Sequence, residues 1–290
     1  MWQHLIRNWI AGYATDQVRK AAVEKARQFA EDDATSHERE TLAPVDVAVI
    51  ASDSSVAGAL SDQLADKTSL RGEKLQVEVG TLGRHRLVVA DRSKSEARAS
   101  DLARAVVEGH QPRWVFSATL ARSLDDSLAA GDVVLATHLL GPQGERLATG
   151  VEVDARSVKP GQGMHLGAIA TSGEQPEPAS AADNALCFDA QSWAVAEVCR
   201  ERKAPCLAVA GITVTGDDAP SAEVANLHKQ ATIAGKLGAF TGAMIRRPSS
   251  VKDLWNEKEK QIVAADRLAQ FLVGMIAQLP PPTDKSAEAD

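Results

Sequence analysis

The side chains that could do chemistry in this chain are few, and the clearest pair follows an apolar run. Asp217-Asp218 comes shortly after residues 206–214, where a carboxylate could bind a ligand or transfer a proton, although a loop leading into a helix explains the pair equally well. The three cysteines form no CxxC pair, and the seven histidines have no metal-ligand spacing. The signatures GxxxxGK[ST], HExxH and GxSxG are absent. No single motif therefore indicates an activity, a metal or a cofactor.

Composition narrows the class of protein. The 290 residues include 32 Lys and Arg against 39 Asp and Glu, so the formal charge is −7, which disfavours nucleic acid as a partner. A hydrophobic fraction of 44% is typical of a globular chain with a sizeable core. No apolar run approaches the roughly 20 residues of a membrane span. An odd, sparse set of cysteines suits a reducing compartment, so we expect a cytoplasmic protein.

The middle of the chain alternates between strand and helix patterns, which predicts an α/β sandwich. We expect strands at residues 46–51, 74–79, 85–90, 113–118, 131–138, 151–153, 164–170 and 206–214. We expect helices at a stretch through Leu60 and Leu64 and at residues 95–109, 189–202, 223–245 and 254–279. The two strands at 74–90 are predicted to form a hairpin across Gly83.

The ends of the chain differ from this body. Residues 1–30 are predicted to form an amphipathic helix with an aromatic stripe of Trp2, Trp9 and Tyr13. The stripe is typical of a helix packed on the body or on a second subunit; contact of residues 1–20 with a membrane surface is a lesser alternative. An acidic linker is expected at 31–44, a single domain at 45–280 and a solvated tail at 281–290.

The order of segments from Val45 to Pro280 resembles the purine nucleoside phosphorylase superfamily, and within it the 5′-methylthioadenosine/S-adenosylhomocysteine nucleosidases. Each segment is weak alone, but five in register are fairly specific. They are DVAVIA from Asp46, RWVFSATLARSL from Arg113, GDVVLA from Gly131, FDAQSWAVAEVC from Phe188 and CLAVAGIT from Cys206. The resemblance implies a three-layer α/β/α sandwich around a central mixed sheet, with the predicted N-terminal helix added to it. Homodimers are common in these nucleosidases, so a homo-oligomer is expected.

The resembled family cleaves an N-ribosidic bond with an acid, a base and a carboxylate that grips the ribose. Alignment places Ser55 where the family has its water-activating Glu. Its Met-Glu pair becomes Ala190-Gln191, and its Ser-Asp pair becomes Thr213-Val214. Its Gly-Val-Gly turn falls on residues 92–94, and its Gly-rich strand end on residues 119–123. The residues expected to line a ligand pocket are Ser55, Thr119, Asp189, Ala190, Gln191, Thr213 and Val214.

Three functions follow from this pattern. The first is a pseudoenzyme that has lost nucleoside hydrolysis and binds a purine nucleoside or pairs with another subunit. The second is an active nucleosidase or phosphorylase with relocated acids, for which Asp53 is favoured over Asp217 by its even offset from the replaced position. The third is an interaction protein that works through its N-terminal helix. No cofactor or metal is expected in any of them.

Overall fold

The computed structural model describes residues 44–72, 75–95, 97–149, 163–171, 185–214 and 249–281, with only the backbone described at 249–257. The chain divides into two compact units at Ala43/Pro44, and every described residue lies in the second. The predicted N-terminal helix, most of the acidic linker, the strand at 151–153, the helix at 223–245 and nearly all of the tail lie outside these ranges. Asp217 and Asp218 lie outside them too.

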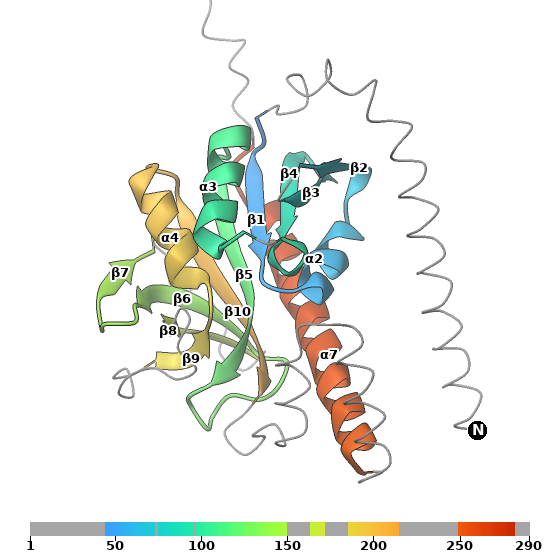
Figure 1. Ribbon diagram of the computed structural model, residues 1–290, viewed down its shortest axis with the longest axis vertical. Coiled ribbons are helices and arrows are strands. Elements are labelled where there is room, and N and C mark those ends of the chain that lie inside the picture. The colour runs from blue at the N-terminus through green and yellow to red at the C-terminus, as the bar shows by residue number, and fades with distance from the viewer. Residues whose placement is uncertain are drawn as a thin grey trace, which may run out of the picture. The chain divides into compact units, whose positions relative to one another are not determined.

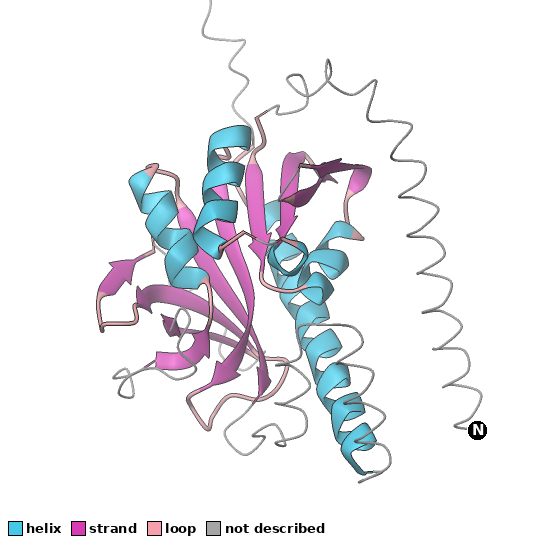
Figure 2. Cartoon of the chain, in the orientation of Figure 1, coloured by secondary structure: helices cyan, strands magenta, loops and turns pink. Residues whose placement is uncertain are grey.

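One mixed sheet of ten strands forms the centre of the described residues (Figures 1 and 2). Its order is β10-β6-β8-β9-β5-β1-β4-β3-β2, with β7 paired to β6 and a further pairing of β10 with β5. The strands are β1 (Val47–Ala51), β2 (Ala65–Arg71), β3 (Gln76–Leu82), β4 (His85–Asp91), β5 (Trp114–Ser123), β6 (Val133–Leu140), β7 (Arg146–Ala148), β8 (Met164–Thr171), β9 (Ala185–Asp189) and β10 (Cys206–Val214). Strands β4, β1, β5 and β10 run parallel side by side, so their carboxyl ends share one edge.

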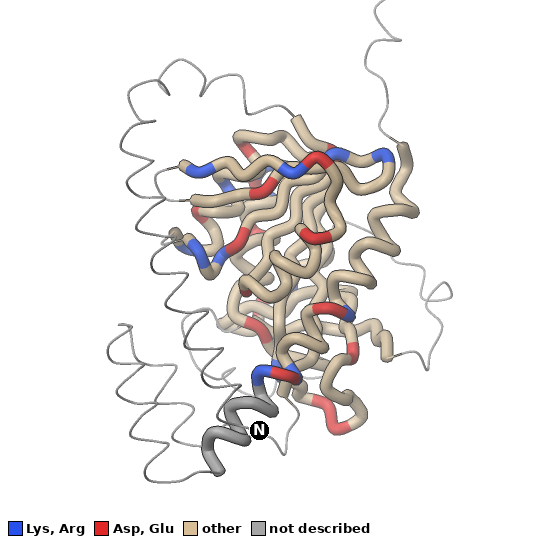
Figure 3. Tube along the Cα trace, turned by 90° about the vertical axis from the view of Figure 1, so that its right-hand side faces the viewer, with Lys and Arg blue, Asp and Glu red and all other residues tan. Residues whose placement is uncertain are grey.

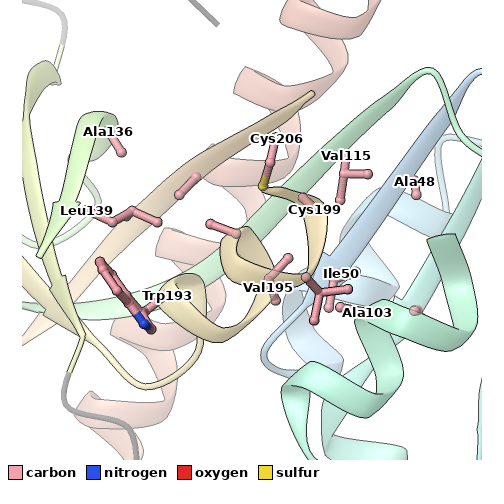
Figure 4. Close-up of a cluster of buried hydrophobic side chains, with 14 of the residues drawn as sticks. Ala48, Ile50, Ala103, Val115, Ala136, Leu139, Trp193, Val195, Cys199 and Cys206 are labelled. Atoms are coloured by element: carbon pink, nitrogen blue, oxygen red, sulfur yellow. The ribbon is translucent and has the colours of Figure 1, made fainter. Parts of the chain in front are cut away.

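Helices cover both faces of this sheet (Figure 1). On one face α3 (Ala99–His110) and α4 (Ser192–Glu201) pack into a core that includes Ile50, Val115 and Trp193 (Figure 4). On the other, α2 (Ser54–Ser61) and α7 (Ser249–Ala277) pack into a second core. The predicted three-layer α/β/α sandwich with a mixed sheet is confirmed.

Strand β1 shows why the sequence predicts this arrangement. Val47, Val49 and Ala51 face the α2/α7 core, whereas Ala48 and Ile50 face the α3/α4 core. All five residues are fully buried, because successive side chains of a strand point to opposite faces and both faces are covered. An unbroken apolar run is therefore required, and burying each of the larger side chains contributes about 1.5–3 kcal/mol.

The structure corrects several predicted elements. The hairpin of β3 and β4 is confirmed by its antiparallel pairing. Strand β2 was not predicted, because its residues are mostly exposed and polar and carry no apolar alternation. The short strands β7 and β9 were not predicted either. Helix α2 ends at Ser61 instead of continuing through Leu64, and α4 begins at Ser192 because Asp189 still belongs to β9.

Candidate functional site

The described residues of the predicted pocket gather at the carboxyl ends of the parallel strands. Thr119 of β5 is in register with Ala210 of β10, and Ala118 with Ala51 at the end of β1. Ser55 lies in the first turn of α2, directly after β1, and is half-buried. Ligands of open α/β sheets bind at this edge, so the topology places the predicted residues where a pocket is expected.

Gln191 ties two elements of this edge together. Its side chain is buried, and its Nε2 donates a hydrogen bond of 3.2 Å to the carbonyl oxygen of Ile50 in β1. The neighbouring Ala190 is exposed. The buried amide thus joins the start of α4 to the end of β1. It adds no charge to the edge, whereas the resemblance drawn from the sequence implies a carboxylate at this position.

Asp189 is buried, and both of its carboxylate oxygens accept hydrogen bonds. Oδ1 accepts from Thr171 Oγ1 at 2.6 Å and from the backbone N–H groups of Gln191 and Ser192 at 3.2 Å each. Oδ2 accepts from the hydroxyl of Ser192. These donors replace the water that the carboxylate gives up on burial. Asp189 therefore holds the start of α4 in place, and its role is structural.

The hydrogen-bond network extends from Asp189 into neighbouring elements. Thr171 Oγ1 accepts from the N–H of Trp193 at 3.3 Å, and the hydroxyls of Ser192 and Ser117 lie 3.2 Å apart. Ser117, Thr171 and Ser192 are all buried. A satisfied polar network of this kind holds β5, β8, β9 and the start of α4 in one arrangement.

Thr119 differs from these residues because its hydroxyl has no partner. The residue is 1% exposed, and Oγ1 makes no hydrogen bond among the described residues. Leaving a buried hydroxyl unsatisfied costs about 1–3 kcal/mol. Within the predicted set, Thr119 is therefore the described residue with a buried hydroxyl that could still bond to a ligand or a water molecule.

The end of β10 offers little proton-transfer chemistry. Thr213 Oγ1 donates to the carbonyl oxygen of Ala121 at 3.3 Å, which ties β10 to β5. Val214 is half-buried and aliphatic, so it can neither donate nor accept a proton. The resemblance drawn from the sequence implies an acid at this position.

Asp53, the fallback base, caps α2. Its Oδ1 accepts from the backbone N–H of Ser55 at 2.7 Å, and the carboxylate is half-buried. Capping of this kind stabilises a helix by about 1 kcal/mol, which gives Asp53 a structural role sufficient to explain its presence.

Asp91 at the end of β4 was missed by the sequence reasoning. Its carboxylate accepts from Ser54 Oγ at 2.7 Å and from Ser93 Oγ at 2.6 Å, and Lys94 Nζ lies 3.3 Å away. Burial acts to raise the pKa of Asp91, but the hydrogen bonds from Ser93 and Ser54 and the charge of Lys94 together bring it below its usual value of 3.8. The only sequence signal was an acid between an apolar run and a Ser-Lys pair. This cluster includes residues 92–94, which the resemblance predicts to occupy the place of a Gly-Val-Gly turn.

The three cysteines are buried and free. Burial raises the pKa of the Cys187 thiol, and the nearby Asp189 carboxylate adds to the rise. A hydrogen bond with Cys199 and burial raise the pKa of Cys206. A thiol held protonated is a poor nucleophile, so Cys187 and Cys206 serve packing. Over the described ranges, no group of three or more His, Cys, Asp or Glu could hold a metal ion, and no helix is long and apolar enough to cross a membrane.

Solved structures share this fold. The 5′-methylthioadenosine/S-adenosylhomocysteine nucleosidase of Helicobacter pylori, crystallised with butyl-thio-DADMe-Immucillin-A, matches with a TM-score of 0.58 and 14% identity over 81% of this chain and 99% of its own. The Neisseria meningitidis nucleosidase, in complex with methylthio-immucillin-A, matches with a TM-score of 0.57 and 14% identity over 81% and 99%. This chain has the nucleosidase fold. The Campylobacter jejuni nucleosidase matches with a TM-score of 0.55 and 18% identity over 81% of this chain and 100% of its own.

Sequence comparisons alone do not find this relationship. No protein-family model matches the chain, and no curated protein matches it. Identities of 14–18% to the nucleosidases show the fold only. The nucleosidase fold thus spans almost the whole length of each of these neighbours.

Proposed function

We propose that this protein is a nucleosidase-like pseudoenzyme, which has lost N-ribosidic hydrolysis and serves as a purine-nucleoside-binding or subunit-pairing homologue. The observation that carries the proposal is the buried Gln191 amide, which donates to the Ile50 carbonyl oxygen at the position of the family's ribose-gripping carboxylate. An uncharged side chain held by the backbone cannot supply the charge that stabilises a cationic ribosyl transition state.

The other two catalytic positions support the same conclusion. Ser55 has a hydroxyl in place of the water-activating carboxylate, and Val214 has no proton to give the leaving purine. Loss of one general acid or base lowers a rate by about 10²–10⁴-fold. Losing the acid, the base and the ribose-gripping group together should leave little turnover. No cofactor is required for this function.

Retained binding is supported by the polar groups that remain at this edge of the sheet and by the structural neighbours. The Helicobacter and Neisseria nucleosidases were crystallised with nucleoside analogues. A purine nucleoside is thus the ligand class that the fold favours. The unpartnered hydroxyl of Thr119 offers such a ligand a buried hydrogen bond. Pairing with a second copy of the chain, as expected from the sequence, is the other part of the proposal.

The test combines adenine release with ligand binding on the full chain. We expect 5′-methylthioadenosine and adenine to raise the melting temperature without adenine being released at an enzyme-like rate. Thr119→Val should abolish the ligand-induced shift, whereas Thr119→Ser, which keeps the hydroxyl, should retain it. Enzyme-like adenine release would refute the loss of activity. Absence of any shift with all nucleosides would refute nucleoside binding, and a monomer at all concentrations would refute pairing.

A second candidate is an active enzyme that uses Asp53. It is favoured by the position of the Asp53 carboxylate, which is half-buried at the carboxyl end of β1, two residues before Ser55. This alternative predicts measurable turnover that both Asp53→Asn and Asp53→Ser abolish, although each substituted residue can still cap the helix. Turnover that survives both changes would exclude Asp53 as the base.

A further inference from the structure

A groove lies at the amino ends of β5 and β10, at the opposite end of these strands from the nucleosidase-like site. It forms where α3 and α4 end and the chain turns into the two strands, and its volume is about 460 Å³. Its walls include the charged and polar residues Glu108, Gln111, Arg113, Arg202 and Lys203, together with apolar residues such as Val107 and Pro205. The size is within the usual range for a binding site.

The groove is positively charged although the whole chain is acidic. Its lining contains three cationic side chains, those of Arg113, Arg202 and Lys203, and one carboxylate, Glu108, which forms an ion pair with Arg202. Arg113 Nη1 donates to the carbonyl oxygen of Pro281 at 3.1 Å, which orients the guanidinium without neutralising it. Lys203 is exposed and forms no ion pair with any described residue. Elsewhere, acidic and basic residues are interleaved along the described chain (Figure 3).

The backbone of the groove contains two unusual residues. Gln111, after α3, has a φ of 44°, and Lys203, after α4, has a φ of 57°. Glycine is preferred in this left-handed conformation, because a β-carbon is strained there. Asp66 is the only other non-glycine residue with positive φ among the described ones. Both helices therefore end in a long polar residue at a position where glycine would be more stable. Backbone strain of this kind is concentrated at functional sites.

We propose that this groove binds an acidic peptide segment of a protein partner. The Arg113 guanidinium and the Lys203 ammonium group, which form no ion pair with a described residue, match the spaced carboxylates of such a segment, since cationic donors form strong charge-assisted hydrogen bonds with carboxylates. The apolar walls accept the segment's aliphatic atoms. Acidic-motif recognition by arginine clusters is a general mode of peptide binding. The site is independent of the nucleosidase-like edge, so it can exist whether or not a nucleoside binds.

The test measures binding of a fluorescein-labelled octaglutamate peptide to the full chain by anisotropy. We expect saturable binding that weakens as salt increases. The double variant Arg113→Gln/Lys203→Gln should weaken binding by about tenfold or more. Lys67→Gln/Arg104→Gln is the matched control, because it also removes two positive charges and neither Lys67 nor Arg104 lines the groove. Equal losses in the control and the double variant would overturn the proposal, since they would indicate a nonspecific charge effect.

Two further measurements separate binding from folding and from small anions. Lys203→Gly should raise the melting temperature, because glycine relieves the left-handed strain, and should still weaken peptide binding; unchanged affinity would overturn the role of Lys203. Inorganic phosphate at millimolar concentration should compete only weakly with the peptide. Tight phosphate binding that the double variant abolishes, without peptide binding, would overturn the peptide proposal and indicate a small-anion site.

Discussion

Polar side chains differ in burial and in hydrogen bonding between the two ends of the parallel strands. At the carboxyl ends, Asp189 and Gln191 are buried and bonded to neighbouring backbone. At the amino ends, Arg202 and Lys203 are exposed; Arg202 forms an exposed ion pair with Glu108, and Lys203 forms none with a described residue. A buried polar group must be paired to be tolerated, so it becomes part of the scaffold, whereas an exposed charge stays available to a partner. The polar groups at the carboxyl ends are thus the more structural of the two sets.

Asp189→Ala should have the largest effect on stability. Removing the carboxylate leaves the Thr171 and Ser192 hydroxyls and two backbone N–H groups without their acceptor. We expect a loss of about 3–4 kcal/mol in the free energy of unfolding, measured by urea denaturation. Asp189→Asn, which keeps one acceptor oxygen, should lose less. Equal stability of Asp189→Ala and the unmodified protein would show that the carboxyl-end network is dispensable.

Gln191→Glu introduces the carboxylate that the resemblance implies at this position. It should destabilise the protein at neutral pH by about 2 kcal/mol, because a buried carboxylate would face the Ile50 carbonyl oxygen. Burial and that carbonyl would raise the folded-state pKa of the new carboxyl. The variant should therefore regain stability as the pH falls, when the protonated group can donate. The measurement is the free energy of unfolding from pH 7 to pH 4. Gln191→Met, which cannot titrate, is the control and should show no such recovery.

Asp91 should make the free energy of unfolding decrease as the pH falls, which is opposite to the effect expected for Gln191→Glu. Its folded-state pKa lies below the ordinary value of 3.8, so its contribution is present above pH 3.8 and is lost as the pH falls through the lower folded value. Asp91→Asn should remove this part of the acid sensitivity and cost about 1 kcal/mol at neutral pH. Denaturation curves between pH 2 and pH 6 test this. Identical pH slopes in both proteins would contradict the assignment to Asp91.

Arg202→Gln at the amino end should have the smallest effect. The ion pair between Arg202 and Glu108 is exposed, with side-chain exposures of 42% and 50%. We expect a change in stability of at most about 0.5 kcal/mol, which disappears in high salt. Unfolding at low and high ionic strength provides the measurement. A loss as large as that of Asp189→Ala would remove the contrast between the two ends.

The sequence predicted the central strands well because their pattern is set by burial on both faces. The predicted β1 begins one residue before the observed strand, and the predicted bounds of β10 are the observed ones. Strand β2 could not be predicted, since it lies at the edge of the sheet with polar exposed residues and is formed by pairing with β3. The same holds for β7, whose three residues carry too little pattern.

A ligand pocket near residues 55, 119, 191 and 214 stays a prediction. The strand register brings Thr119 and Val214 onto the neighbouring strands β5 and β10, and Ser55 and Gln191 follow β1 and β9 along the chain. That Gln191 would be buried and bonded to Ile50 could not be foreseen, because the partner lies 141 residues away in the sequence. Asp91 was overlooked for the same reason: Ser54 approaches it from a separate element.

The amino-acid sequence by itself determined the layers of the fold and the absence of carboxylates at residues 55, 191 and 214, because apolar periodicity and residue identity are local properties. Only the tertiary structure decided what the remaining polar groups do. Hydrogen bonds and burial depend on distant segments coming together. The pairing of Asp189 and Gln191, the unpaired hydroxyl of Thr119 and the basic groove at the other end of the strands all arise in that way.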